Sequence, residues 1–134
     1  MVAFTAYSEL SYNYKSGDVI IFDQTVSNLG GNFNTETSIF LCPYTGLYQF
    51  SIHILAAINS TAQANIMLDG QQQVIAWADQ ILDAYPQSSN TVMVECTQGQ
   101  TVWVESSSSV DGSRIFNNAF KHTTFSGVLL QKYN

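Results

Sequence analysis

The sequence contains few charged residues. They make up 10% of its 134 residues, against about a quarter in typical soluble domains, and only 4 of them are lysine or arginine. The net charge of −6 argues against a nucleic-acid interface, which needs clustered cations, and against docking on anionic lipid. The polar surface must therefore be built from Ser, Thr, Asn and Gln. This composition favours an extracellular β protein or a close-fitting oligomer.

Long apolar runs and helical spacing are also missing. No run of about 18 apolar residues is present, so no membrane insertion is expected. Apolar residues do not recur at intervals of three and four between capping residues, so no helix is predicted. No signal peptide precedes the strand-like segment Val2–Thr5, and a secreted protein would already have lost it. With 13% aromatic residues and 134 positions, one packed all-β domain over residues 1–134 is predicted.

Cysteine is scarce as well. Cys42 and Cys96 are too few for a disulfide scaffold, and each lies inside an apolar run. Two buried free thiols are the simpler interpretation. A single bridge between them is the alternative, and the sequence leaves both open.

Strand patterns fill the chain. Residues 46–54 alternate with period two, which places Tyr48, Phe50, Ile52 and Ile54 on one face. Further strands are predicted at residues 19–22 and 123–133. Two hairpins are also predicted, 64–68 with 73–77 through Asp69-Gly70, and 91–97 with 100–105 through Gln98-Gly99.

About ten such strands separated by turns indicate a sandwich or barrel. The least regular stretch, residues 106–122, is predicted to be a long surface loop between two core strands. Loops of this kind commonly carry function, although plain solvated connections are as common.

Catalytic signals are sparse. His53 and His122 are the only histidines, and His53 is expected to be a packed or hydrogen-bonded strand residue. No nucleophile-elbow, zinc-protease or phosphate-loop motif is present.

Asp79 and Asp83 are four residues apart and offer oxygen ligands for calcium, although solvated loop carboxylates are the simpler interpretation. Asn59 begins a sequon, Asn59-Ser60-Thr61, and is a candidate glycosylation site.

Several segments, taken in order, resemble the complement C1q globular-head family, which shares its fold with the tumour necrosis factor cytokines. They span essentially the whole chain, so the ordered set is far more specific than any one of them. The segments are residues 2–7, 21–23, 28–33, 40–43, 46–53, 99–105 and 124–130.

The resemblance implies a ten-stranded jelly-roll sandwich of the C1q/TNF type that assembles as a tight homotrimer or heterotrimer. It further implies a secreted binding module that is not an enzyme and requires no cofactor. Family members recognise immune complexes, microbial surfaces, glycans or cell-surface receptors. They usually hang from a collagen or coiled-coil stalk, and this chain contains no Gly-X-Y repeat.

The resemblance also makes calcium an optional ligand. Some complement heads hold calcium through an aspartate in the loop that Asp79 occupies here. The partner glutamine of those heads falls on Pro86, one position before Gln87, and Ala78 stands where they carry a cysteine. The correspondence is therefore partial.

Two functions follow from the resemblance. The first is a lectin-like pattern-recognition protein of innate immunity that binds glycans or microbial surface polymers. The second is a receptor-binding or matrix-organising trimer that recognises a protein partner. For the first, amides and carboxylates bond to hydroxyls, a tyrosine stacks on a sugar, and cations pair with an anionic group. The candidate ligand residues are Tyr85, Asp111, Arg114, Asn117, Asn118 and Lys121.

Overall fold

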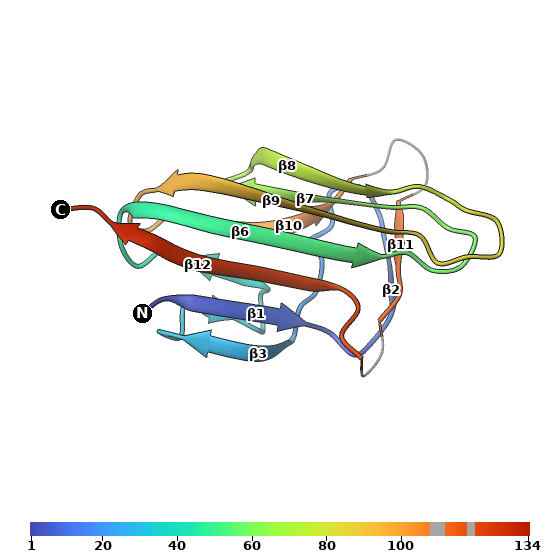
Figure 1. Cartoon of the computed structure of the whole chain (residues 1–134), viewed down its shortest axis with the longest axis horizontal. Coiled ribbons are helices and arrows are strands. Elements are labelled where there is room, and N and C mark those ends of the chain that lie inside the picture. The colour runs from blue at the N-terminus through green and yellow to red at the C-terminus, as the bar shows by residue number, and fades with distance from the viewer. Residues whose placement is uncertain (108–111, 118–119) are drawn as a thin grey trace.

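Two five-stranded antiparallel sheets face each other in the computed structural model, which describes residues 1–107, 112–117 and 120–134 (Figure 1). A two-stranded ribbon crosses one end of this sandwich. The described residues include no helix, and hence none long and apolar enough to cross a membrane. The predicted ten-stranded jelly roll is confirmed, with the ribbon as an addition.

The strands are arranged as follows. The first sheet has the order β3 (Gln24–Leu29), β1 (Ala3–Tyr7), β12 (Thr124–Lys132), β6 (Gly46–Leu55) and β9 (Gln87–Cys96). The second has the order β4 (Phe33–Asn34), β5 (Ile39–Leu41), β10 (Thr101–Ser106), β7 (Ala62–Leu68) and β8 (Gln71–Ala78). The ribbon pairs β11 (Ser113–Ile115) with β2 (Tyr12–Tyr14).

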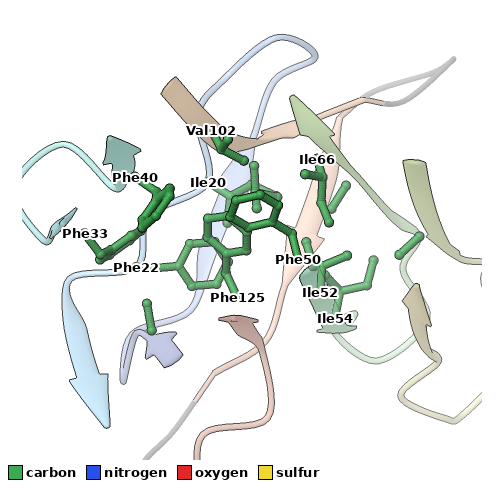
Figure 2. Packing of buried hydrophobic residues seen from close by; sticks show 14 of the residues in the cluster. Ile20, Phe22, Phe33, Phe40, Phe50, Ile52, Ile54, Ile66, Val102 and Phe125 are labelled. Carbon is green, nitrogen blue, oxygen red and sulfur yellow. The ribbon is translucent and has the colours of Figure 1, made fainter. Parts of the chain in front are cut away.

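Aromatic side chains from both sheets fill the space between them (Figure 2). Phe4 of the first sheet stacks on Phe33 and Phe40 of the second, with ring centroids 4.7 and 5.1 Å apart. Phe125 meets Phe4 edge-on at 5.0 Å, and Phe50 meets Phe40 at 5.5 Å. Burying each ring contributes roughly 1.5–3 kcal/mol, so this cluster is a main source of stability.

The alternation predicted for residues 46–54 is confirmed by β6. Its four predicted inward side chains are each at most 1% exposed, and the intervening residues face outward. The Tyr48 hydroxyl donates a 2.6 Å hydrogen bond to the Tyr44 carbonyl, and burial raises the pKa of Tyr48. The polar tip of a buried tyrosine is thereby satisfied.

Residues 19–22 do not form the predicted strand, although Ile20 and Phe22 are buried in the core. Side chains occupy backbone donors that a neighbouring strand would otherwise use. The Tyr14 hydroxyl accepts from the Ile21 N–H at 3.1 Å, and the Ser38 hydroxyl accepts from the Phe22 N–H at 2.8 Å. The segment pairs with β10 at the Val19–Glu105 bridge, where the Ile20 N–H donates to the Val104 carbonyl at 2.8 Å, but the pairing does not extend to Ile21 and Phe22.

The predicted hairpin of 91–97 with 100–105 is wrong. β9 pairs along its whole length with β6 in one sheet, whereas β10 pairs with β5 and β7 in the other. The turn at Gln98-Gly99 therefore carries the chain from sheet to sheet. Both strands bury one apolar face in the same core. Two strands of a hairpin within one sheet would bury their apolar faces in the same way. The apolar pattern therefore does not distinguish a hairpin from a crossing between sheets. The other predicted hairpin is confirmed as β7 and β8.

The stretch 106–122 departs, in the residues that the structure describes, from the surface loop predicted for it. Its described part includes β11, in which Ser113 and Ile115 are each 1% exposed. The Ser113 hydroxyl accepts from the Gln63 N–H at 2.9 Å and donates to the Gln63 carbonyl at 3.1 Å. This segment is thus fastened to the core sheet rather than lying over it.

We expect Gly127→Ala to lower the free energy of unfolding by about 2–3 kcal/mol. A Cβ at this position of β12 would lie 2.5 Å from the Phe4 ring and 2.8 Å from the Phe50 ring, so both rings would have to shift. Chemical denaturation measures the loss. The control is Ser126→Ala, which removes one 2.9 Å hydrogen bond to Thr5 and should cost about 1 kcal/mol. Equal losses in the two variants would contradict the packing argument.

Candidate functional site

Three groups of loops meet at the end of the sandwich that lies away from both termini (Figure 1). The Ala57 N–H donates to the Arg114 carbonyl at 2.9 Å, and the Ala56 N–H donates to the Pro86 carbonyl at 2.8 Å. Backbone hydrogen bonds thus hold segments that are far apart in sequence in a fixed arrangement. We call this set the distal loop cluster, and it consists of residues 55–61, 79–87, 112–117 and 120–123.

Tyr85 and Arg114 share one face of the distal loop cluster. The Tyr85 ring is 45% exposed and packs edge-on against Phe116, with centroids 5.0 Å apart. Burial alternates from Ser113 to Asn117, so Arg114 and Phe116 point to the same side. Because Tyr85 contacts Phe116, the tyrosine ring and the guanidinium group lie on that side together.

Arg114 is held by its backbone and presents its side chain to solvent. Its N–H donates to the Thr61 carbonyl at 3.2 Å, while its carbonyl accepts from Ala57. The Nε donates to the Asn13 side-chain oxygen at 3.4 Å. A guanidinium group positioned in this way can pair with a carboxylate or donate to hydroxyl groups.

Asn117 is buried rather than displayed. It is 6% exposed, and its Oδ1 accepts from the Thr123 N–H at 3.2 Å. Its backbone N–H donates to the Ser11 hydroxyl at 2.8 Å, and its carbonyl accepts from the same hydroxyl at 3.0 Å. These contacts fasten the segment before β12, so the geometry supports a structural role for Asn117.

The three remaining ligand candidates are Lys121, Asp111 and Asn118. Lys121 is exposed, has a positive φ of 60° and places its Nζ 4.9 Å from the centre of the Tyr7 ring. This cation–π contact directs it toward β1. Asp111 and Asn118 lie outside the described residues.

The residues with oxygen ligands do not converge on a metal site within one chain. Asp79 and Asp83 are exposed; Asp79 accepts from the Gln80 N–H at 2.9 Å, and the Asp83 N–H donates to Asn59 at 2.6 Å. Among the described residues, no three His, Cys, Asp or Glu side chains gather closely enough to hold a metal. Asp79 as a calcium ligand stays a prediction. Asn59 is exposed, as the predicted glycosylation requires.

His53 is a hydrogen-bonded strand residue, as expected. Its Nδ1 lies 2.7 Å from the His122 carbonyl, and its Nε2 lies 3.1 Å from the Gln87 side-chain oxygen. The His122 ring lies 6.2 Å from the ring of Phe116. Neither histidine forms part of a described nucleophile–base arrangement.

The sequence analysis missed a group of exposed apolar side chains in the same loops. Ile58, Ile81 and Leu82 are 44%, 55% and 79% exposed. Exposed apolar side chains mark a binding surface where they form a contiguous patch. The signal was present in the sequence, because Ile81-Leu82 interrupts an otherwise polar loop between two acidic residues.

We expect Asn117→Ala to lower the free energy of unfolding by about 1–3 kcal/mol, because the buried Thr123 N–H would lose its acceptor. Thermal and chemical denaturation measure the loss. The matched control, Asn13→Ala, removes an exposed amide and should stay within about 0.5 kcal/mol of the parent. An Asn117→Ala protein as stable as the control would return Asn117 to the list of ligand candidates.

Sequence comparison identifies relatives of the chain. Residues 3–130 match the C1q domain family. A segment of Caprin-2 from zebrafish, Danio rerio, is 35% identical over 112 residues, which is 83% of this chain and 12% of that protein. The chain thus spans about an eighth of the length of this relative, so the match concerns the domain alone.

Solved structures agree on the fold. The globular domain of a zebrafish complement 1qA protein superposes with a TM-score of 0.82 at 15% identity, covering 99% of this chain and 100% of the other. Eiger TNF from S. frugiperda gives 0.79 at 8% identity over 99% and 94%, and murine APRIL gives 0.73 at 15% over 96% and 98%. C1q/TNF-type domains are ligand-binding modules. With the family match over residues 3–130, this chain belongs to the C1q domain family.

Proposed function

We propose that this chain is a secreted, non-enzymatic, homotrimeric recognition module of innate immunity that binds glycans or microbial surface polymers through the distal loop cluster. The observation that carries the proposal is the contact of the exposed Tyr85 ring with Phe116, which points to the same side as Arg114. An aromatic ring packs on the apolar face of a sugar, and a guanidinium group bonds to its hydroxyl or carboxylate groups. Together they supply the two contacts that a saccharide needs.

The rigidity of these two groups supports the proposal. Tyr85 is braced by a ring contact, and the backbone of Arg114 is bonded on both sides, to Thr61 and Ala57. Little conformational freedom remains to be lost when a ligand binds, which favours affinity for a small flexible saccharide. Both termini lie away from this end, so a stalk or partner domain attached there would leave the cluster accessible.

The outer face of the first sheet supports trimer formation. Along its centre it carries small hydroxyl side chains that bond to one another, Thr5 to Ser126 at 2.9 Å and Ser51 to Thr91 at 3.0 Å. Exposed Met93 lies on the same face, beside a shallow depression of about 200 Å³. The hydroxyl-bearing centre of this face can be buried against a second copy without desolvating ions, and the exposed Glu95 lies toward the end of β9. Three copies would present three distal loop clusters, which raises avidity on a repetitive surface.

We expect Ser51→Arg to convert the trimer into a monomer, because three large cations would enter the uncharged interface. Light scattering after size exclusion should give three times 14.8 kDa for the parent and one times this mass for the variant. The control is Gln71→Arg, an exposed change on the other sheet that should remain trimeric. Circular dichroism checks that each variant folds. A monomeric parent, or a trimeric folded Ser51→Arg protein, would contradict the assembly proposed here.

A second candidate function is recognition of a protein receptor. The observation that favours it is the exposure of Ile58, Ile81 and Leu82 beside Tyr85 in the distal loop cluster. Apolar and aromatic side chains dominate the energetic centres of protein interfaces. On this alternative, Arg114 would serve as a polar contact at the rim.

A glycan and microbial-polysaccharide array separates the two functions. We expect the parent trimer to bind a defined saccharide class, and Tyr85→Ala and Arg114→Ala each to lower affinity at least tenfold. The chain offers a matched control pair at the opposite end, where Lys132 lies 4.2 Å from the centre of the Tyr44 ring. Tyr44 is 41% exposed, close to the exposure of Tyr85, so Tyr44→Ala and Lys132→Ala should leave binding unchanged.

The outcomes are distinct. Equal losses in both pairs of variants would place the ligand elsewhere on the domain. A blank array from a folded trimer would overturn the glycan proposal in favour of a protein partner. In that case Leu82→Ser should weaken binding to a cell surface, because it removes the most exposed apolar side chain of the three.

A further inference from the structure

Two cysteines that the proposed function does not use lie together in the core. Cys42 and Cys96 are free thiols, each 1% exposed and part of the same buried cluster. The two thiols are close enough for each to change the pKa of the other. A disulfide forms without backbone movement only where the Cα atoms lie roughly 4.4–6.8 Å apart, so the backbone that carries the two cysteines decides whether the bond can form.

The two thiols come from opposite sheets. Cys42 directly follows β5 of the second sheet, and Cys96 is the last residue of β9 in the first. The turn after Cys96 brings the two strands together. The Cys42 N–H donates to the Gln100 carbonyl at 2.9 Å, and its carbonyl accepts from the Gly99 N–H at 2.9 Å.

This turn is itself held in one conformation. The Gln100 N–H donates to the Thr97 carbonyl at 3.0 Å, and the Gln100 side-chain oxygen accepts from the Thr97 N–H at 2.8 Å. Gly99 has a φ of 93°, a value that glycine adopts without strain. The position of Cys42 relative to Cys96 is therefore set by backbone hydrogen bonds and not by the thiols alone.

We propose that Cys42 and Cys96 form a disulfide bond that links the two sheets. The bond would lie at the end of the sandwich opposite the distal loop cluster and would close a loop over residues 42–96. Closing a long loop restricts the unfolded chain, which stabilises the folded one. That the bond forms in the cell rests on the proposed secretion, because disulfides persist in oxidising compartments. The juxtaposition of the thiols does not depend on it.

The chemistry is thiol–disulfide exchange with a small-molecule or protein disulfide as oxidant. One cysteine thiolate attacks the oxidant, and half of the oxidant leaves as a thiol that takes up one proton. The second thiolate then attacks the mixed disulfide and releases the other half as a thiol, with the second proton. The protein loses two electrons and two protons, and one external disulfide becomes two thiols.

Because the two cysteines are buried in the folded protein, the exchange must take place before folding is complete. The neighbouring Cys96 thiol, together with burial, raises the pKa of the Cys42 thiol, whereas the Cys42 thiol lowers the pKa of Cys96. With both thiols 1% exposed, an external disulfide also cannot reach them in the packed sandwich. The bond is therefore made while the chain folds, and it is then shielded from reductants.

The test is refolding in a glutathione redox buffer. The reduced, unfolded chain is refolded, denatured and treated with N-ethylmaleimide, and its intact mass is measured. We expect no maleimide on most of the parent protein and two on the sample refolded with reductant. The variants Cys42→Ala and Cys96→Ala should each carry one maleimide or one glutathione. Since oxidised and reduced parent share one sequence, their melting temperatures compare directly, and the oxidised form should melt about 5–15 °C higher.

Free thiols in correctly refolded protein would contradict the proposed disulfide. A parent that regains its native circular dichroism in the redox buffer yet carries two maleimides would overturn the bond. The same maleimide labelling, applied to protein produced through a eukaryotic secretory pathway, shows whether the bond forms in the cell. A bond formed in the buffer but absent from the cellular protein would count against the proposed secretion and leave the geometry intact. Thiols that remain free in both samples would count against the bond itself.

Discussion

The packing of aromatic rings around Gly127 is the constraint on which the rest of the sandwich depends. Phe4 and Phe50 lie on the two strands that flank β12, and their rings occupy the space that a side chain at Gly127 would fill. The rings can then reach Phe40 in the facing sheet. The spacing of the sheets follows from this contact, because close-packed interiors tolerate little change in volume.

A rigid core of this kind allows the two ends of the molecule to serve different purposes. At the end near the termini, tight turns connect the sheets, and the two thiols meet there. At the other end, the longer loops bond to one another through their backbones and leave Tyr85, Arg114 and Leu82 exposed. Loops held by a fixed scaffold can vary in sequence without disturbing the fold, which suits a recognition surface.

The sequence predicted local features well and pairing poorly. The face of each side chain in 46–54 depends only on the alternation within that strand, so it was predicted correctly. The partner of β9 depends on a ten-residue ladder with β6, which lies about forty positions away, and a turn dipeptide does not report on it. For the same reason Asn117 looked like a displayed loop residue. Its backbone bonds to the Ser11 hydroxyl, which lies more than a hundred positions away, and local sequence does not report on such a contact.

The small number of charged residues bears both on the proposed trimer and on how it would attract a ligand. A trimer would carry three times the formal charge of −6, and each chain has only 4 lysine and arginine residues. Attraction of anionic ligands from a distance is then weak, because the overall field is repulsive and is screened within about 8–10 Å in physiological salt. Selectivity must instead come from short-range contacts. In the proposed binding mode, Arg114 and Tyr85 would supply these contacts, because the surrounding backbone and Phe116 hold them in place before any ligand arrives.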